Sequence, residues 1–94
     1  MFLIKKPSGA MNKRHEVLFY SNANCPLCDE AREVLHTLKR RFFLNIQEID
    51  ITADSAIFEK YKNIIPVVII DGKFTFGARV SEDDILSCLK ELKD

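Results

Sequence analysis

Two cysteines separated by two residues, in the segment Cys25-Pro26-Leu27-Cys28, are the residues of this chain whose type and spacing point most directly to chemistry. Three positions along a helix bring two side chains to the same side, close enough for a disulfide whose Cα atoms lie about 5–6 Å apart. Cys25 falls where an apolar run has ended and a helical pattern begins. A thiolate at a helix N-terminus faces unpaired N–H groups, so we expect its pKa to fall below the free-cysteine value of about 8.5. Cys25 is therefore the candidate nucleophile, and Cys28 is the candidate resolving thiol.

This pair predicts thiol–disulfide exchange, but it also fits half of a zinc site. In exchange, the Cys25 thiolate attacks a substrate disulfide, and Cys28 then attacks Cys25 and leaves a Cys25–Cys28 disulfide. A structural zinc site needs four ligands, and the chain offers Cys88, His15 and His36 for the other two. Cys88 shares a helical face with apolar residues, as a core residue does, and no second C-x-x-C exists. Redox chemistry is therefore favoured, and no residue is predicted to bind a metal.

The elements that position the pair follow from the apolar pattern. Strand-like runs are predicted at 17–20, 47–51, 66–70 and 73–76. Apolar residues at helical spacing run from Leu27 to Phe42, from Ile57 to Ile64 and from Ile85 to Leu92. Asp71-Gly72 between the last two strands predicts a hairpin, because a type I′ turn needs positive φ at both central residues.

The resulting order of elements is β-α-β-α-β-β-α. A helix crosses between the first two strands, which makes them parallel, and the last two strands form an antiparallel hairpin. A sheet of this kind needs helices on both of its faces. The pattern therefore predicts an α/β protein with the thioredoxin-like arrangement, a four-stranded mixed sheet flanked by helices.

Charge is unevenly distributed along the chain. The 14 lysines and arginines balance 14 aspartates and glutamates, so nucleic acid is not an expected partner. Four of these cations lie within the first 14 residues, which lack sustained periodicity. We expect residues 1–15 to form a flexible basic arm and residues 16–94 to form one domain. The longest apolar stretch has seven residues, far short of the about 18 of a spanning helix, so no membrane partner is expected and the cytoplasm is the expected location.

Ile65-Pro66 stands at the start of the third predicted strand. A proline that enters a strand removes a ladder hydrogen bond, so its position calls for a reason. One interpretation is an ordinary proline at a strand start. The other is a cis peptide bond that leaves the Ile65 backbone free to pair with an extended substrate beside Cys25. The pattern alone favours neither.

Several segments together resemble the glutaredoxins of the thioredoxin superfamily, and most of all a small glutaredoxin-like family. The segments are Val17-Leu18-Phe19-Tyr20, Cys25-Pro26-Leu27-Cys28-Asp29-Glu30-Ala31, Glu48-Ile49-Asp50-Ile51, Ile65-Pro66-Val67 and Asp71-Gly72-Lys73. The resemblance covers residues 16–93 and implies the glutaredoxin type of the thioredoxin-like fold. It also implies that Cys25 is the nucleophile, that Cys28 is the resolving cysteine and that Pro66 is a cis-proline opposite them.

The function implied by this resemblance is thiol–disulfide oxidoreduction. The substrates would be protein disulfides or glutathione mixed disulfides, and an unidentified reductant would restore the dithiol. No permanently bound cofactor is implied, and glutathione is a candidate co-substrate. The candidate substrate-binding residues are Pro26, Leu27, Ile65 and Pro66.

Two positions and one segment depart from the glutaredoxin pattern. Asn22 stands where a lysine is usual, and Leu27 stands where tyrosine is frequent. The Gly-Gly-x-Asp-Asp segment that helps to hold glutathione is replaced by Phe76 to Asp84, without the double glycine. Because glutathione carries carboxylates, these changes are expected to weaken its capture, with Arg79 as a candidate replacement cation.

Two alternatives from other functional classes stay open. One is a glutathione-dependent iron–sulfur cluster or metal-binding module that uses Cys25. The other is a redox-inactive interaction protein of the thioredoxin fold, in which the cysteine pair is vestigial.

Overall fold

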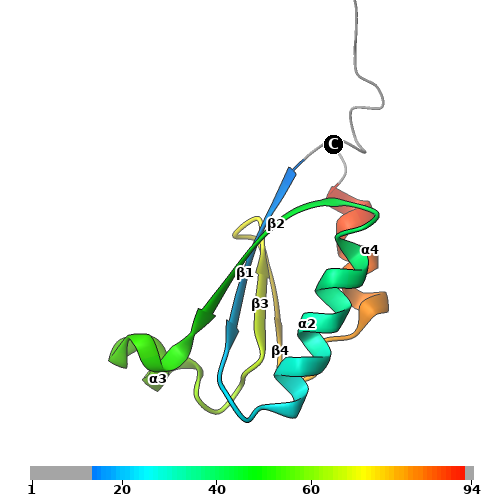
Figure 1. The fold of residues 1–94 in the computed structure, drawn as a ribbon. Coiled ribbons are helices and arrows are strands. Elements are labelled where there is room, and N and C mark those ends of the chain that lie inside the picture. The colour runs from blue at the N-terminus through cyan, green and yellow to red at the C-terminus, as the bar shows by residue number, and fades with distance from the viewer. Residues whose placement is uncertain (1–13, 93–94) are drawn as a thin grey trace, which may run out of the picture.

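Four strands, three α-helices and one short 3₁₀ helix make up residues 14–92, the part of the chain that the computed structural model describes (Figure 1). In chain order these elements are β1 (Arg14–Ser21), α2 (Pro26–Leu38), β2 (Phe43–Asp50), η2 (Ile51–Ala53), α3 (Ser55–Tyr61), β3 (Val67–Ile70), β4 (Phe74–Gly77) and α4 (Glu82–Leu92). The strands lie in the order β2-β1-β3-β4, with β1 parallel to β2 and antiparallel to β3, and β3 antiparallel to β4. The predicted element order and the mixed four-stranded sheet are confirmed.

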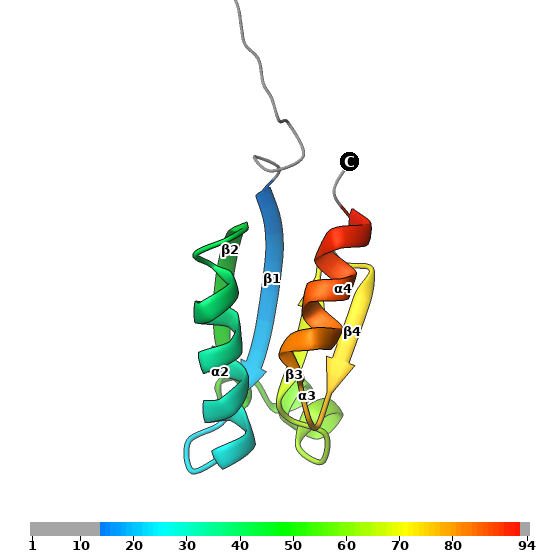
Figure 2. The ribbon, with the colours of Figure 1, turned by 90° about the vertical axis from the view of Figure 1, so that its right-hand side faces the viewer.

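Alternation along β1 decides which face of the sheet holds the main core. Val17 and Phe19 are buried, whereas Leu18 and Tyr20 are half-buried. Because successive strand side chains point to opposite faces, Val17 and Phe19 point together toward α2 and α4, which lie side by side on this face (Figure 2). The two helices add to the same core the residues that their spacing predicts, namely Ala31, Leu35, Leu38, Ile85 and Leu89. No helix within residues 14–92 is long and apolar enough to cross a membrane.

Helix α3 lies on the opposite side of the sheet, so helices flank both faces as predicted (Figures 1 and 2). Its Tyr61 ring stacks on the ring of Tyr20 in β1, with the centroids 4.6 Å apart. The Asp54 carboxylate accepts hydrogen bonds from the N–H groups of Ala56 and Ile57, at 2.8 and 3.1 Å, and so caps this helix. α3 therefore covers the end of the sheet where β1 and β2 finish.

The folded region starts earlier than the sequence predicts. β1 begins at Arg14 and His15 is only 1% exposed, so the predicted boundary after residue 15 is wrong by two residues. The His15 Nδ1 lies 2.8 Å from Asp71 Oδ2, and the Glu16 N–H donates to Asp71 Oδ1 at 2.8 Å. Asp71 is 56 residues away along the chain, so the local pattern carries no sign that His15 belongs to the sheet. The rest of the predicted arm, residues 1–13, lies outside the described residues.

Strand β2 is longer than predicted and ends one residue earlier. It begins at Phe43, which pairs with Arg14 of β1, and it ends at Asp50. The Asp50 carboxylate accepts a hydrogen bond from the Thr52 N–H at 2.9 Å, which caps η2 and places Ile51 in that short helix. Pairing with β1 therefore extends β2 toward the N-terminus as far as Phe43, and the Asp50 cap ends the strand.

In the second half of the chain, the hairpin turn has the predicted geometry, and a side chain caps the last helix. At the hairpin, φ is 54° at Asp71 and 67° at Gly72, and the Lys73 N–H donates to the carbonyl oxygen of Ile70 at 3.0 Å. Positive φ at both central residues is the mark of a type I′ turn. At the start of α4, the Ser81 Oγ accepts a hydrogen bond from the Asp84 N–H at 3.0 Å, so Ser81 is the N-cap of this helix.

Candidate active site

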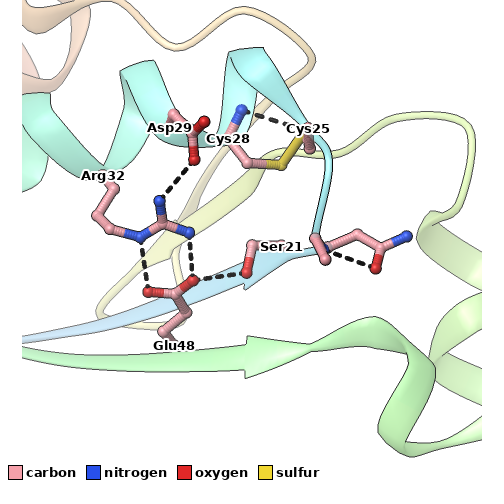
Figure 3. The surroundings of a disulfide bond; sticks show 8 residues. Ser21, Cys25, Cys28, Asp29, Arg32 and Glu48 are labelled. Carbon is pink, nitrogen blue, oxygen red and sulfur yellow. Dashed lines mark hydrogen bonds and ion pairs between the residues drawn. A yellow bond between two sulfur atoms is a disulfide. The ribbon is translucent and has the colours of Figure 1, made fainter.

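Cys25 and Cys28 are joined by a disulfide at the N-terminus of α2 (Figure 3). Cys25 is the N-cap residue, and Pro26 occupies the first turn, where its missing N–H has no helical partner. The Cα atoms of the two cysteines lie 5.1 Å apart, and the Cys28 N–H donates to the Cys25 sulfur at 3.1 Å. Cys28 is fully buried, Cys25 and Leu27 are half-buried, and Pro26 is exposed. Cys25 is thus the outer cysteine of the pair, and Cys28 is the inner one.

Ile65 and Pro66 lie at the same end of the sheet as the cysteines. β1 and β3 are antiparallel neighbours, and the pairing of Tyr20 with Val67 places the end of β1 beside the start of β3. Cys25 follows β1 by four residues, and Pro66 directly precedes β3. Ile65 and Cys25 both pack against the main core, and the Ile65–Pro66 peptide bond is cis, as the resemblance implies. The fold thus brings the predicted site residues to one end of the molecule.

A charged network that the sequence analysis missed lies next to the cysteines. Arg32 of α2 makes two hydrogen bonds to the Glu48 carboxylate of β2, from Nε to Oε1 at 3.0 Å and from Nη2 to Oε2 at 2.6 Å. The Arg32 Nη1 donates to Asp29 Oδ1 at 2.8 Å, and the Ser21 Oγ donates to Glu48 Oε2 at 2.7 Å (Figure 3). The guanidinium carbon also lies 5.6 Å from the centre of the Phe19 ring. The i,i+3 spacing of Asp29 and Arg32 is the one signal in the sequence, since Glu48 comes from another element.

The network holds Glu48 and Arg32 in their charged forms. Hydrogen bonds from Arg32 lower the pKa of the Glu48 carboxyl below its ordinary value of 4.5. Partial burial of the carboxyl raises this pKa, and the hydrogen bond from the Ser21 hydroxyl lowers it further, so the net change is a decrease. Hydrogen bonds to Glu48 and then to Asp29 raise the pKa of the Arg32 guanidinium. The ion pair is therefore present throughout the neutral range.

Replacing Glu48 with glutamine is expected to cost stability at neutral pH but not in acid. A carboxyl whose pKa is lower in the folded state adds stability above its ordinary, unfolded pKa of about 4.5, and this contribution is lost as the pH falls toward the folded pKa. Glutamine does not titrate, so the difference in unfolding free energy between the two proteins should be largest near about pH 7 and shrink below about pH 4. Because the pair is partly exposed, the difference stays below about 1 kcal/mol. Urea unfolding across this range measures it, and a difference independent of pH would contradict the assignment.

The loop between β4 and α4 reaches the first turn of α2. The Arg79 Nη1 lies 3.7 Å from Glu30 Oε1, and both side chains are largely exposed. The Ala78 N–H lies 2.9 Å from the carbonyl oxygen of Ile64 and 3.0 Å from that of Pro66. The Arg79 guanidinium therefore lies at the first turn of α2, where its charge faces a carboxylate of this chain.

Replacing Ala78 with glycine is expected to stabilise the protein by about 0.5 kcal/mol. Ala78 has a φ of 64°, and this left-handed conformation costs alanine about 1–2 kcal/mol, whereas glycine loses about 0.5–1 kcal/mol of extra chain entropy on folding. The matched control is Ala56→Gly in α3, which should destabilise by about 0.8–1 kcal/mol because a helical φ suits alanine. Urea unfolding compares the two, and an Ala78→Gly protein less stable than the parent would refute the argument.

The third cysteine and the histidines lie apart from the disulfide. Cys88 in α4 is 6% exposed, and burial raises the pKa of its thiol, with smaller contributions from Glu91 and Asp71. His36 is exposed on α2, and His15 pairs with Asp71. Within residues 14–92, no three His, Cys, Asp or Glu side chains gather where a metal ion would bind. Cys88 is thus a core residue, as predicted.

Comparison with known proteins agrees with this geometry. A model of the glutaredoxin-like domain matches residues 16–90. The chain is 33% identical over 79 residues to the glutaredoxin-like protein YDR286C homolog of Dictyostelium discoideum, a match that covers 78% of this chain and 73% of that protein. A mutant thioredoxin from Halobacterium salinarum superposes with a TM-score of 0.69 at 16% identity, covering 85% of this chain and 75% of that one. A malarial protein superposes with a TM-score of 0.68 at 16% identity, covering 84% of this chain and 97% of that one. These likenesses show the thioredoxin fold.

Proposed function

This chain belongs to the glutaredoxin-like domain family, and on that basis we propose that it is a thiol–disulfide oxidoreductase in which Cys25 and Cys28 form the redox-active pair. The observation that carries the proposal is the position of Cys25 as the partly exposed N-cap of α2, with the buried Cys28 one turn behind it. A Cys25 thiolate there accepts the Cys28 N–H and faces the positive end of the helix dipole. Both effects favour the thiolate, which is the reactive form.

Reduction of a substrate proceeds in two exchange steps. In the first, the Cys25 thiolate attacks one sulfur of the substrate disulfide, the Cys25–substrate bond forms, and the other substrate sulfur leaves as a thiolate. In the second, Cys28 loses its proton to solvent and attacks the Cys25 sulfur, which releases the remaining substrate thiolate. The two substrate thiolates take up protons from water, and two electrons have passed from the pair to the substrate. The product on the protein is the Cys25–Cys28 disulfide seen in the structure.

A second turnover requires an external thiol reductant. Two glutathione molecules or the dithiol of a thioredoxin reductase system would supply the two electrons, so no cofactor has to remain bound. A reducing cytoplasm, the proposed location, provides both classes of reductant.

Acidic surroundings support protein substrates over free glutathione. An open groove of about 420 Å³ runs along α2 from its first turn, and its lining includes the carboxylates of Asp29, Glu30, Glu33 and Glu82. The nearby cation, Arg79, already faces Glu30. Glutathione carries two carboxylates, which these charges repel. Among the proposed substrates, these charges favour protein disulfides over glutathione mixed disulfides, and Pro26, Leu27, Ile65 and Pro66 are the proposed contact residues.

Turnover by the reduced protein tests this proposal. The substrates are insulin and a glutathione mixed disulfide, each assayed by NADPH consumption through either glutathione with glutathione reductase or thioredoxin reductase. Reduction above the uncatalysed rate supports the proposal, and the reductase that sustains it identifies the electron donor. Absence of turnover in both systems would contradict it and point to an interaction protein. Visible absorbance after anaerobic reconstitution with iron and sulfide, lost on replacing Cys25, would instead favour the cluster-binding alternative.

A further inference from the structure

The Arg32–Glu48 network contacts both flanks of the cysteine segment, residues 22–28. Ser21, the last residue of β1, donates to Glu48 at 2.7 Å. Asp29, which directly follows the segment, accepts from Arg32 at 2.8 Å. Two further hydrogen bonds join Arg32 to Glu48, so a continuous series of hydrogen bonds links the residue before the segment to the residue after it (Figure 3).

We infer that this clamp, made of Ser21, Asp29, Arg32 and Glu48, positions the two cysteines and thereby sets their redox equilibrium, an inference that rests on the proposed redox function. Joining two sulfurs costs chain entropy unless the chain already holds them close together. By restraining both ends of the cysteine segment, the clamp raises the effective concentration of one thiol at the other. The four clamp residues act through the backbone of the segment and are positioning residues.

The clamp is attached to the sheet more firmly than an ordinary surface ion pair. Ser21 is only 4% exposed, and the Arg32 guanidinium lies over Phe19, which is 1% exposed. Phe19 and Glu48 are register partners in β1 and β2, so two of the three groups that Arg32 contacts come from adjacent strands. The two parallel hydrogen bonds between guanidinium and carboxylate also fix their relative orientation. The cysteine segment is thus held against two strands.

A Glu48→Gln substitution tests the inference because it weakens the clamp with little change of shape. The first readout is the equilibrium constant for Cys25–Cys28 disulfide formation in glutathione redox buffers, which we expect to fall about threefold. The second is the pKa of the Cys25 thiol in the reduced protein, which we expect to rise because the N-cap geometry is held less firmly. A direct charge effect has the opposite sign, since loss of a nearby negative charge favours a thiolate. The direction of the pKa change therefore separates positioning from charge.

Two further variants complete the test. Asp29→Asn opens the clamp at its other end through a side chain that is 73% exposed, so it remains informative if Glu48→Gln folds poorly, and we expect changes of the same sign. Asp83→Asn, in the first turn of α4, removes the same charge from an exposed side chain that belongs neither to the clamp nor to the groove lining, and should leave both readouts unchanged. An equilibrium constant that stays the same in both clamp variants, or a Cys25 pKa that falls, overturns the inference. Both readouts concern the protein's own cysteine pair and not its turnover of substrate. Failure of the clamp inference therefore does not contradict the proposed reductase activity, which the turnover assay tests.

Discussion

Replacing Cys25 with serine is expected to lower the disulfide reductase activity about a hundredfold or more, because a hydroxyl does not supply the thiolate that attacks the substrate. Serine is a favoured N-cap residue, so the helix start should survive the substitution and the loss should come from chemistry. NADPH-coupled turnover measures the loss, and circular dichroism checks the fold. The control is Cys88→Ala, which removes the buried third thiol and should retain the activity. A Cys25→Ser protein with full activity would show that the nucleophile is wrongly assigned.

The matching substitution at Cys28 separates two routes through the same site. In the dithiol scheme, Cys28→Ser blocks the second exchange step, so the mixed disulfide between Cys25 and a protein substrate accumulates and is visible by mass spectrometry. Full activity of this variant on protein disulfides would contradict the role of Cys28 as the resolving thiol. Activity kept only on glutathione mixed disulfides would assign those substrates to a route that needs Cys25 alone.

Phe19→Ala is expected to lower the free energy of unfolding by about 3–5 kcal/mol. Phe19 is 1% exposed in the middle of β1, packed under α2, and the Arg32 guanidinium lies over its ring. Alanine would remove the apolar contacts and leave a cavity, because the strand and the helix on either side relax only in part. A domain typically has about 5–15 kcal/mol of stability, so the variant should lose a large part of it. The urea midpoint measures the change.

Phe43→Ala is the matched control for that experiment. Phe43 begins β2, the strand next to β1, but this residue is 55% exposed. The same substitution there should change the free energy of unfolding by about 0.5 kcal/mol or less. Equal costs at the two positions would show that the Phe19 ring does not carry the core contacts assigned to it.

The parts of the fold that were predicted correctly depend on neighbours in the chain. Leu35 and Leu38 lie on one face of α2 because helical spacing puts them there, and Asp71 and Gly72 adopt positive φ because the turn requires it. Predictions failed where a distant partner decides the outcome. His15 is drawn into the sheet by Asp71, 56 residues later.

The candidate site also has features that local sequence predicts and features that depend on distant partners. The sequence alone determined the cysteine pair and its place at the start of a helix, because these follow from residue types at short spacing and from the order of elements. The position of Pro66 opposite the pair was implied only by the resemblance to glutaredoxins. Only the tertiary structure decided that Ser21 and Arg32 meet on Glu48 beside that pair, and that Arg79 faces Glu30. The physical reason is that these contacts join side chains from separate elements. Their meeting depends on strand register and helix packing, which no spacing along the chain specifies.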